Sequence, residues 1–226
     1  MENELNLTAP EQLPDTAKPS LVSRLFSGFF SYFFHPLFVP VYVICFLLYI
    51  HPSAFTGFSD ENRFRTLLIV VLNLVFFPLI SVLLLRAVGF VESIFLRTQK
   101  DRIIPYIASG IFFFWTYTVF KQQEAYPLLL VSFILGIFFA SSAALIANIY
   151  LKVSMHAIGM GGWLGFFLVI MHTNSMLMSF PIATVLLITG LVCTSRLMSK
   201  NHIPAEIYLG IVIGMISQFV AFYVTS

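Results

Sequence analysis

The sequence predicts an all-α protein, a polytopic transmembrane helix bundle with about six to seven spans plus an interfacial helix. Three observations lead to this fold class. Of the 226 residues, 59% are hydrophobic and only 10% are charged, whereas a soluble domain carries about 25% charged residues. The mean hydropathy is +0.93. The apolar residues also gather in long runs, and about 20 such residues make a helix that crosses a bilayer.

Residues 1–20 differ in composition from the rest of the chain. They have few apolar side chains, three prolines and four acidic residues, which are Glu2, Glu4, Glu11 and Asp15. This composition predicts a disordered polar tail before a single transmembrane helical domain over residues 21–226. The tail lacks the basic start and apolar centre of a secretory signal, so we expect the chain to insert through its own spans.

The first apolar run covers residues 29–50 and is interrupted by Pro36 and Pro40. Each proline removes a backbone donor and therefore predicts a kink or a late start of the helix. The second run covers residues 66–85. Residues 89–102 then mix apolar and charged side chains, which predicts an interfacial amphipathic helix that leads into the next span.

Five further apolar runs follow. They cover residues 103–120, 127–151, 157–171, 176–194 and 204–224. The third of these runs contains four glycines at short spacing, which are Gly159, Gly161, Gly162 and Gly165. A small-residue face of this kind predicts close packing against another helix.

Polar and charged residues gather in three clusters between the runs, at residues 97–102, 152–156 and 195–206. Two membrane crossings separate each cluster from the next, so we expect all three on the same side of the membrane. Their positions at helix ends avoid much of the roughly 2.5–3.5 kcal/mol that a charge at the membrane centre costs. Brought together, the clusters would form an anion site.

The third cluster contains a histidine and a carboxylate at helical spacing. His202 and Glu206 are four residues apart, so on a helix they share one face. The carboxylate can hold the imidazole in one tautomer and raise its nucleophilicity. Arg196 can bring a permanently charged planar group to an anion beside it. Pro204 suits the first turn of a helix, which places His202 at a helix N-terminus that favours an anion.

At these residues the chain resembles the type 2 phosphatidic acid phosphatase superfamily of membrane lipid phosphatases. The family's third motif is Ser-Arg, five residues, His, three residues, Asp. Ser195, Arg196 and His202 match it in identity and spacing, and Glu206 stands in place of the Asp. The resemblance covers a phosphatase-like core at about residues 90–225.

The other two motifs of the family are matched in part. In the second, Pro-Ser-Gly-His, Ser154 and His156 are in place, while Val153 and Met155 replace the proline and the glycine. The first motif is Lys, six residues, Arg-Pro. Here Arg102 has Pro105 three residues on, and Lys100 or Arg97 would substitute for the lysine.

The resemblance implies a metal-independent phosphohydrolase with no cofactor. His202 would attack phosphorus to form a phosphohistidine, Glu206 would orient His202, and His156 would protonate the leaving oxygen. Six residues would bind the phosphate oxygens, and these are Arg196, Arg102, Lys100, Arg97, Ser154 and Ser195. The substrate would be a lipid phosphate of the phosphatidate, phosphatidylglycerophosphate or polyprenyl diphosphate class, with its tail entering laterally between helices.

Other interpretations stay open. The same fold could serve as a catalytically inactive lipid-phosphate binding or carrier protein, and the changed second motif motivates this alternative. The cations at 97–102 could instead anchor a helix to anionic headgroups. A small-solute transporter fits less well, because the spans hold almost no charge at mid-depth. The net charge of +2 argues against a nucleic-acid partner.

The sequence also bears on the membrane that holds the protein, on metal binding and on which side the clusters face. We expect a multi-pass protein of the bacterial cytoplasmic (inner) membrane, among membrane lipids. The histidines outside the clusters, His35, His51 and His172, have no partner at metal-ligand spacing, so no metal site is expected. When the cations of the three clusters are left out of the count, three cations remain on each side of the membrane. The positive-inside rule therefore does not indicate which side is cytoplasmic.

Overall fold

The computed structural model describes residues 21–51, 53–91, 93, 96, 98–173, 177–199 and 202–226, with the side chains of residues 22 and 23 excepted. The elements in chain order are α1 (Leu21–Phe33), α2 (Val39–Cys45), the π-helical turn η1 (Phe46–Ile50), α3 (Asp60–Val71), the π-helical turn η2 (Leu72–Phe76), α4 (Phe77–Ala87), α5 (Gln99–Lys121), α6 (Leu128–Tyr150), α7 (Met155–Thr173), α8 (Ser179–Met198) and α9 (Pro204–Thr225). Within the described part there is no strand, and six helical segments are long and apolar enough to cross a membrane. The predicted fold class is confirmed.

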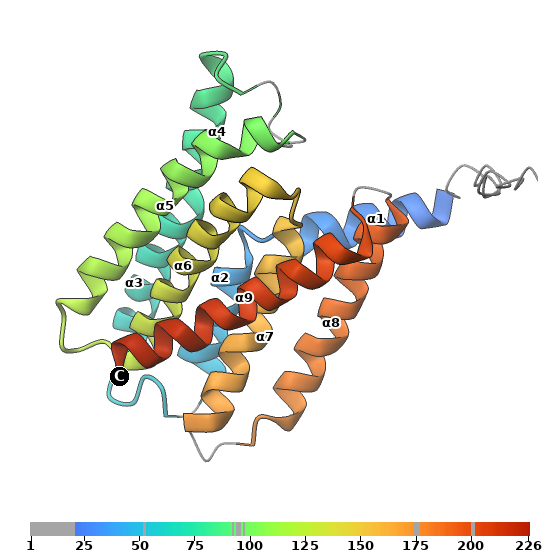
Figure 1. Ribbon diagram of the computed structural model, residues 1–226. Helices are drawn as coiled ribbons and strands as arrows, with labels where there is room; N and C mark the ends of the chain where they lie inside the picture. The colour runs from blue at the N-terminus through green and yellow to red at the C-terminus, as the bar shows by residue number, and fades with distance from the viewer. Residues whose placement is uncertain are drawn as a thin grey trace, which may run out of the picture.

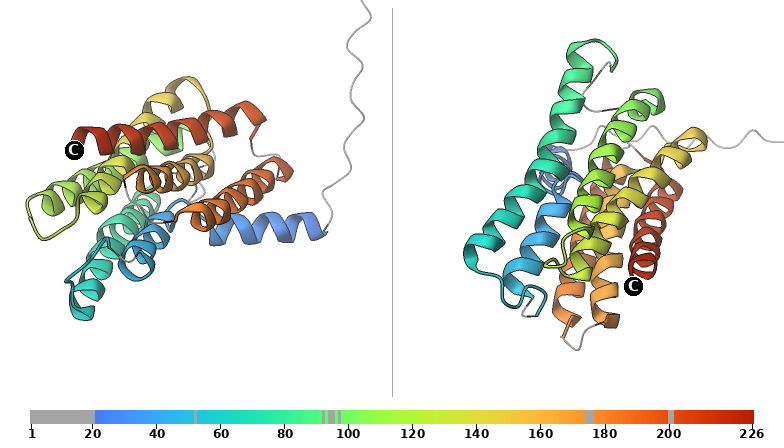
Figure 2. Two further views of the ribbon diagram at one scale, coloured as in Figure 1. Left: turned by 90° about the horizontal axis from the view of Figure 1, so that it is seen from below. Right: turned by 90° about the vertical axis from the view of Figure 1, so that its left-hand side faces the viewer.

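The spans alternate in direction, so their ends gather at two levels (Figure 1). Helices α5, α7 and α9 begin at the same end of the bundle at which α6 and α8 end, and we call it the site end. Helix α1 runs crosswise to the spans beside the end of α8 (Figures 1 and 2). This crosswise orientation is the one expected of a helix at a membrane surface.

The first apolar run is broken, as its prolines predict. Residues 34–38 form a turn between α1 and α2 in which Phe38 N donates to His35 O at 2.8 Å. Pro40 lies in the first turn of α2, where its missing N–H costs nothing. The continuous segment Val39–Ile50 is short. At 1.5 Å per residue it is about 18 Å long, against about 30 Å for a hydrocarbon core.

Helices α3 and α4 form one span, Asp60–Ala87, with the π-helical turn η2 in its middle. Ser59 caps its start, because the Ser59 hydroxyl accepts from Asn62 N at 3.3 Å. Pro78 is the second residue after η2, in the first turn of α4. Proline has no N–H for the carbonyl four residues earlier and its ring crowds that carbonyl, and a π-helical turn is one way a helix absorbs such a local change.

The predicted interfacial helix over residues 89–102 is wrong in position. The described residues between Gly89 and Thr98 are not helical, and only residues 99–102 are helical, as the first turn of α5. Gly89 and Leu96 have positive φ angles of 81° and 47°, which a right-handed helix does not allow. Thr98 then caps α5, because its hydroxyl accepts from Asp101 N at 3.1 Å.

Helix α7 occupies the centre of the bundle. About 72% of its apolar stretch is buried, against at most half for each other span. Its small-residue face packs on α9 as predicted. A Cβ on Gly165 would lie 2.7 Å from Met215 Cα, and Gly161 likewise faces the backbone at Ile211. The central position of α7 brings its first turn, with His156, into the middle of the site end.

Candidate functional site

His202 and Glu206 form a close hydrogen-bonded pair. His202 Nδ1 lies 2.6 Å from Glu206 Oε2, and the two side chains are 4% and 18% exposed. Glu206 belongs to the first turn of α9, and His202 precedes the N-cap residue Ile203. Because the carboxylate accepts from Nδ1–H, the lone pair of the imidazole is on Nε2. The contact that the four-residue spacing predicts therefore forms, but His202 lies before the helix and not on its face.

The environment of His202 favours its neutral form. Burial lowers the pKa of His202 below its usual value, and the positive charges of Arg196 and Arg102 lower this pKa further, while the hydrogen bond and charge of Glu206 raise it. The net shift is downward. A neutral imidazole with its Nε2 lone pair available is the nucleophilic form of the side chain.

Ser154 joins the beginnings of α7 and α9. Its backbone N–H donates to Glu206 O at 3.3 Å. Its hydroxyl accepts from Ala157 N at 3.4 Å, and the residue is fully buried. Ser154 therefore caps α7 and holds the first turn of α9, with Glu206, against it. These contacts place the second cluster directly beside the third.

Arg102 fixes the beginning of α5 to the same place. Its Nε donates to Leu96 O at 2.9 Å and its Nη1 donates to Val153 O at 3.0 Å. The residue is only 4% exposed. Both acceptors are backbone carbonyls, so the guanidinium group is held in one orientation without a carboxylate partner. The first cluster is thus tied to the residue that precedes Ser154.

Arg196, in the last turn of α8, is the second guanidinium of the site. Its Nη1 donates to Ser31 Oγ at 2.9 Å. Its buried Nε has no hydrogen-bond partner in the described part of the chain. The positive charges of Arg196 and Arg102 lie close enough to oppose one another.

The site holds more positive than negative charge. In the described residues neither Arg102 nor Arg196 takes part in an ion pair. The charge of Glu206 reaches Arg102, but its carboxylate is bonded to His202. Buried charges are stable only when they are paired and hydrogen-bonded. Two partly buried guanidinium groups beside one carboxylate therefore form a site that would be stabilised by a bound anion.

His156 lies in the first turn of α7 and is buried. Its Nε2 is 3.0 Å from Ser31 O. A carbonyl only accepts, so Nε2 carries a proton and Nδ1 is the nitrogen that remains for proton exchange. Ser31 thus contacts two site residues at once, His156 through its carbonyl and Arg196 through its hydroxyl.

Three other predicted phosphate-binding residues take different positions. Ser195 is fully buried, and its hydroxyl donates to Val192 O at 2.7 Å within its own helix. Lys100 is exposed in the first turn of α5. Arg97 lies outside the described residues. The structure therefore brings together His202, Glu206, His156, Arg102, Arg196 and Ser154, and the Ser195 hydroxyl points into α8.

Sequence reasoning missed Ser31 and His35. The ring of His35 lies 5.3 Å from that of His156, centroid to centroid, at an interplanar angle of 82°. The available signal was weak: Ser31 and His35 are the two polar side chains in the aromatic stretch of residues 29–35, and they are four residues apart. Both belong to a segment outside the three motifs.

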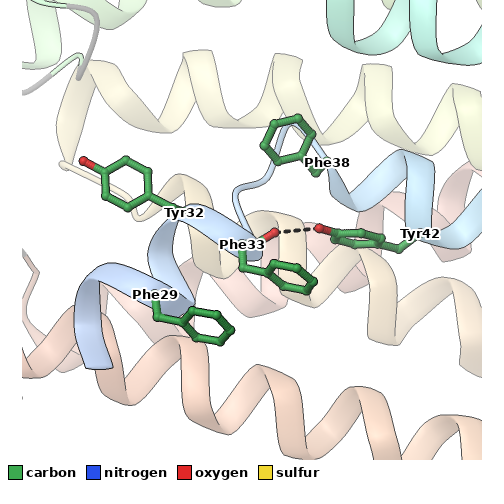
Figure 3. Close-up of a pocket in the computed structure, with 5 residues that line it drawn as sticks. All are labelled: Phe29, Tyr32, Phe33, Phe38 and Tyr42. Atoms are coloured by element: carbon green, nitrogen blue, oxygen red, sulfur yellow. Dashed lines mark hydrogen bonds between the residues drawn. The ribbon is translucent and has the colours of Figure 1, made fainter. Parts of the chain in front are cut away.

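An aromatic groove of about 450 Å³ lies on the same α1–α2 segment. Figure 3 shows the residues that line it, which are Phe29, Tyr32, Phe33, Phe38 and Tyr42. The hydroxyl of Tyr42 donates to Phe33 O at 2.7 Å, so the groove presents mainly ring carbon. An open apolar groove beside a polar site at the end of the spans suits a hydrocarbon chain.

Comparisons of the chain with protein-family models, with curated proteins and with solved structures find no match. The described residues also contain no group of three or more His, Cys, Asp or Glu that could hold a metal ion.

Proposed function

We propose that this protein is an integral membrane lipid-phosphate phosphohydrolase, a divergent member of the type 2 phosphatidic acid phosphatase superfamily. One observation carries the proposal: the His202–Glu206 pair, joined at 2.6 Å, stands beside two guanidinium groups that form no ion pair among the residues that the structure describes. A nucleophile with a fixed tautomer and an anion site beside it are the two components that attack on a phosphate ester requires.

In the proposed reaction, the Nε2 lone pair of His202 attacks phosphorus and the bond from phosphorus to the lipid oxygen breaks. Glu206 accepts from Nδ1–H and stabilises the positive charge that develops on the ring. His156 gives a proton from Nδ1 to the leaving oxygen. This transfer requires a ring protonated on both nitrogens, and the negative charge of a bound phosphate dianion would favour that form. Water then gives a proton to Nδ1 of His156 and attacks phosphorus, the phosphorus–nitrogen bond to His202 breaks, and inorganic phosphate leaves.

Arg102 and Arg196 would bind the phosphate oxygens throughout. The two backbone hydrogen bonds of Arg102 hold it in place before substrate arrives, so it needs little reorganisation as charge develops on the transferred group. Such preorganised donors contribute most when water is excluded. Lys100, exposed in the first turn of α5, would add longer-range attraction, and Arg97 stays a candidate from the sequence alone.

The substrate would be a phosphatidate, phosphatidylglycerophosphate or polyprenyl diphosphate, or a relative of these. The site end lies where the apolar spans finish, which is the level of lipid headgroups. A headgroup bound there leaves its hydrocarbon chain beside α1 and α2. As part of the proposal we place the protein in a bacterial inner membrane, since helical rather than barrel spans are typical of that membrane.

The experiment that tests this function measures phosphate release from a panel of lipid phosphates by the detergent-purified protein, with chelator and no added metal. Wild type should release phosphate, and His202→Ala should release none. His172→Ala is the matched control, because His172 is exposed at the other end of α7, and it should keep full activity. Labelled substrate should also leave an acid-labile phosphohistidine on wild type alone.

The second candidate is a catalytically inactive lipid-phosphate binder. The observation that favours it is Ser154, whose amide and hydroxyl are both occupied by backbone partners, so that its observed role is structural. Intact protein that retains lipid phosphates but releases no phosphate from any of them, and traps no phosphohistidine, would select this function over hydrolysis.

A further inference from the structure

We propose that the turn between α1 and α2 completes the anion site: the Nε2–H of His35 donates to a phosphate oxygen, and Ser31 positions Arg196 and His156 around that phosphate. This inference rests on the proposed phosphate site, but it does not require turnover. It adds a binding residue and a positioning residue from a segment outside the three motifs.

The tautomer of His35 is fixed by its own turn. Leu37 N donates to His35 Nδ1 at 3.3 Å, so Nδ1 carries the lone pair and Nε2 carries the proton. Burial, and then the charge of Arg196, lower the pKa of His35 to about 4. At neutral pH the ring is therefore an uncharged donor whose N–H is directed away from the turn that holds it.

The ring of His35 lies within the site. It makes an edge-on contact with His156, with centroids 5.3 Å apart, and it is close enough to Arg196 to feel its charge. In the described part of the chain, Nε2 of His35 has no hydrogen-bond acceptor. A neutral donor is the suitable third group here, because a third cation would add repulsion to that between Arg102 and Arg196.

Ser31 links the same two site residues by direct hydrogen bonds. Its carbonyl holds His156 Nε2 at 3.0 Å and its hydroxyl holds Arg196 Nη1 at 2.9 Å. Because His156 would act through Nδ1 and Arg196 through its remaining N–H groups, Ser31 fixes both side chains without occupying the atoms that would meet the phosphate.

The turn is packed firmly enough to position these groups. A Cβ on Gly159 of α7 would lie 3.0 Å from Pro36 Cβ, so the turn rests directly on α7. Phe34 packs against Trp163 of α7 with ring centroids 6.5 Å apart. Small errors in the placement of binding groups cost affinity and rate, and these contacts limit such errors.

Two substitutions at His35 distinguish the proposed donation by Nε2–H to phosphate from the acceptance by Nδ1 of the Leu37 N–H, which holds the turn. In His35→Asn the side-chain oxygen takes the place of Nδ1 and can accept from Leu37 N, but nothing replaces Nε2–H. In His35→Gln the amide nitrogen takes the place of Nε2 and keeps a donor there. The matched control is His51→Asn. His51 Nδ1 also accepts a backbone N–H, from Ala54 at 3.1 Å, in a turn far from the site.

The measurement is the dissociation constant for inorganic phosphate, by calorimetry on the full chain in detergent, with thermal melting to establish folding. His35→Asn should weaken phosphate binding by about tenfold or more, the value of a hydrogen bond to a charged group. His35→Gln and His51→Asn should bind about as wild type does. The KM for a lipid phosphate should rise in parallel in His35→Asn, because both ligands present the same oxygens.

Folded His35→Asn that binds inorganic phosphate as wild type does would overturn the role of His35, and wild type that binds none would overturn the site itself. Phosphate binding that depends on His35, in a protein that hydrolyses nothing, would support this inference while excluding the hydrolase. For Ser31, Ser31→Ala should raise the KM and the phosphate dissociation constant, and Ser31→Thr, which keeps the hydroxyl, should restore both. Equal values for the two variants would contradict the positioning role.

Discussion

The carboxylate beside His202 is one methylene longer than that of an aspartate, and the position of His202 explains how the pair still closes. His202 precedes α9 and Glu206 lies in its first turn, so the histidine is free of the helical geometry that would fix its distance from residue 206. The observed 2.6 Å contact shows that the loop places the ring where the longer side chain reaches it. A glutamate at position 206 therefore reaches the imidazole ring from this helix.

The same pair yields a pH prediction. The pKa of His202 is lowered, with burial as the largest cause and Glu206 opposing it. The nucleophile is the unprotonated ring, so kcat/KM should rise with pH through this pKa and reach its plateau at a pH below that expected for an exposed histidine. Glu206→Gln removes the charge that raises the pKa. The rising limb should then move to lower pH, and the plateau should fall by roughly 10²–10⁴-fold.

A pH–rate series on wild type and Glu206→Gln, with Glu61→Gln as a control, checks this. Glu61 pairs with Arg65 at 2.9 Å near the other end of the bundle. Glu61→Gln should therefore leave the pH at which kcat/KM rises unchanged. Movement of the limb to higher pH in Glu206→Gln would contradict the assignment of the limb to His202.

At the level of elements, the contact between α7 and α9 sets the position of both motif-bearing helix ends. Glycines on each helix face the backbone of the other, as Gly161 does at Ile211 and Gly214 does at Ile158. Apolar side chains gain little by association inside a lipid phase, so close backbone packing is what favours this pair. Any change that separates the two helices also separates Ser154 from Glu206.

Gly214→Ala should therefore destabilise the protein, since its Cβ would meet the Ile158 carbonyl, which cannot move aside. Overpacking of this kind costs about 1–3 kcal/mol. Gly190→Ala in α8 is the matched control, because its Cβ would meet nothing within 4 Å. Thermal melting in detergent should show a lower midpoint for Gly214→Ala and an equal or higher one for Gly190→Ala. Equal midpoints for both variants would disprove the packing argument.

The positions of the elements could be predicted wherever composition alone determines them. The run over 127–151 became α6 at Leu128–Tyr150, and the run over 204–224 became α9 at Pro204–Thr225. The non-helical segment after Gly89 was missed, because its mixture of apolar and charged residues also fits an amphipathic helix, and a positive φ at a leucine, as at Leu96, leaves no signal in such a pattern.

The candidate site was predictable in its local part only. Spacing predicted the His202–Glu206 pair, which spans four residues. Ser31 was out of reach, because its partners His156 and Arg196 lie 125 and 165 residues further along the chain. No periodicity encodes such a contact, and a serine in an aromatic stretch carries no distinctive signal of its own.

For the whole molecule, the alternating direction of the spans puts the beginnings of α5, α7 and α9 and the end of α8, which carry the described residues of the three clusters, at one end of the bundle. The beginnings of α3, α6 and α8 lie at the other end. This arrangement makes a topology prediction. On a background of Cys45→Ser and Cys193→Ser, single cysteines at exposed Arg86 and Leu151 lie at the site end, and those at Glu124 and Leu177 lie at the other.

A membrane-impermeant maleimide applied to sealed vesicles should therefore label one pair of these cysteines and spare the other, and permeabilised vesicles should label all four. Labelling of Leu151→Cys and Glu124→Cys from the same side would disprove the alternating arrangement. The side on which Leu151→Cys reacts also identifies the leaflet that presents headgroups to the site.

The hydrogen bonds of Arg102 have a consequence for how this sequence can change over time. Its two acceptors are the carbonyls of Leu96 and Val153, and every amino acid has a carbonyl. A substitution at either position therefore leaves the acceptor carbonyl in the sequence, so the anchor of the guanidinium does not depend on one particular side chain there. An arginine anchored in this way can keep its position while the side chains that surround its acceptors change.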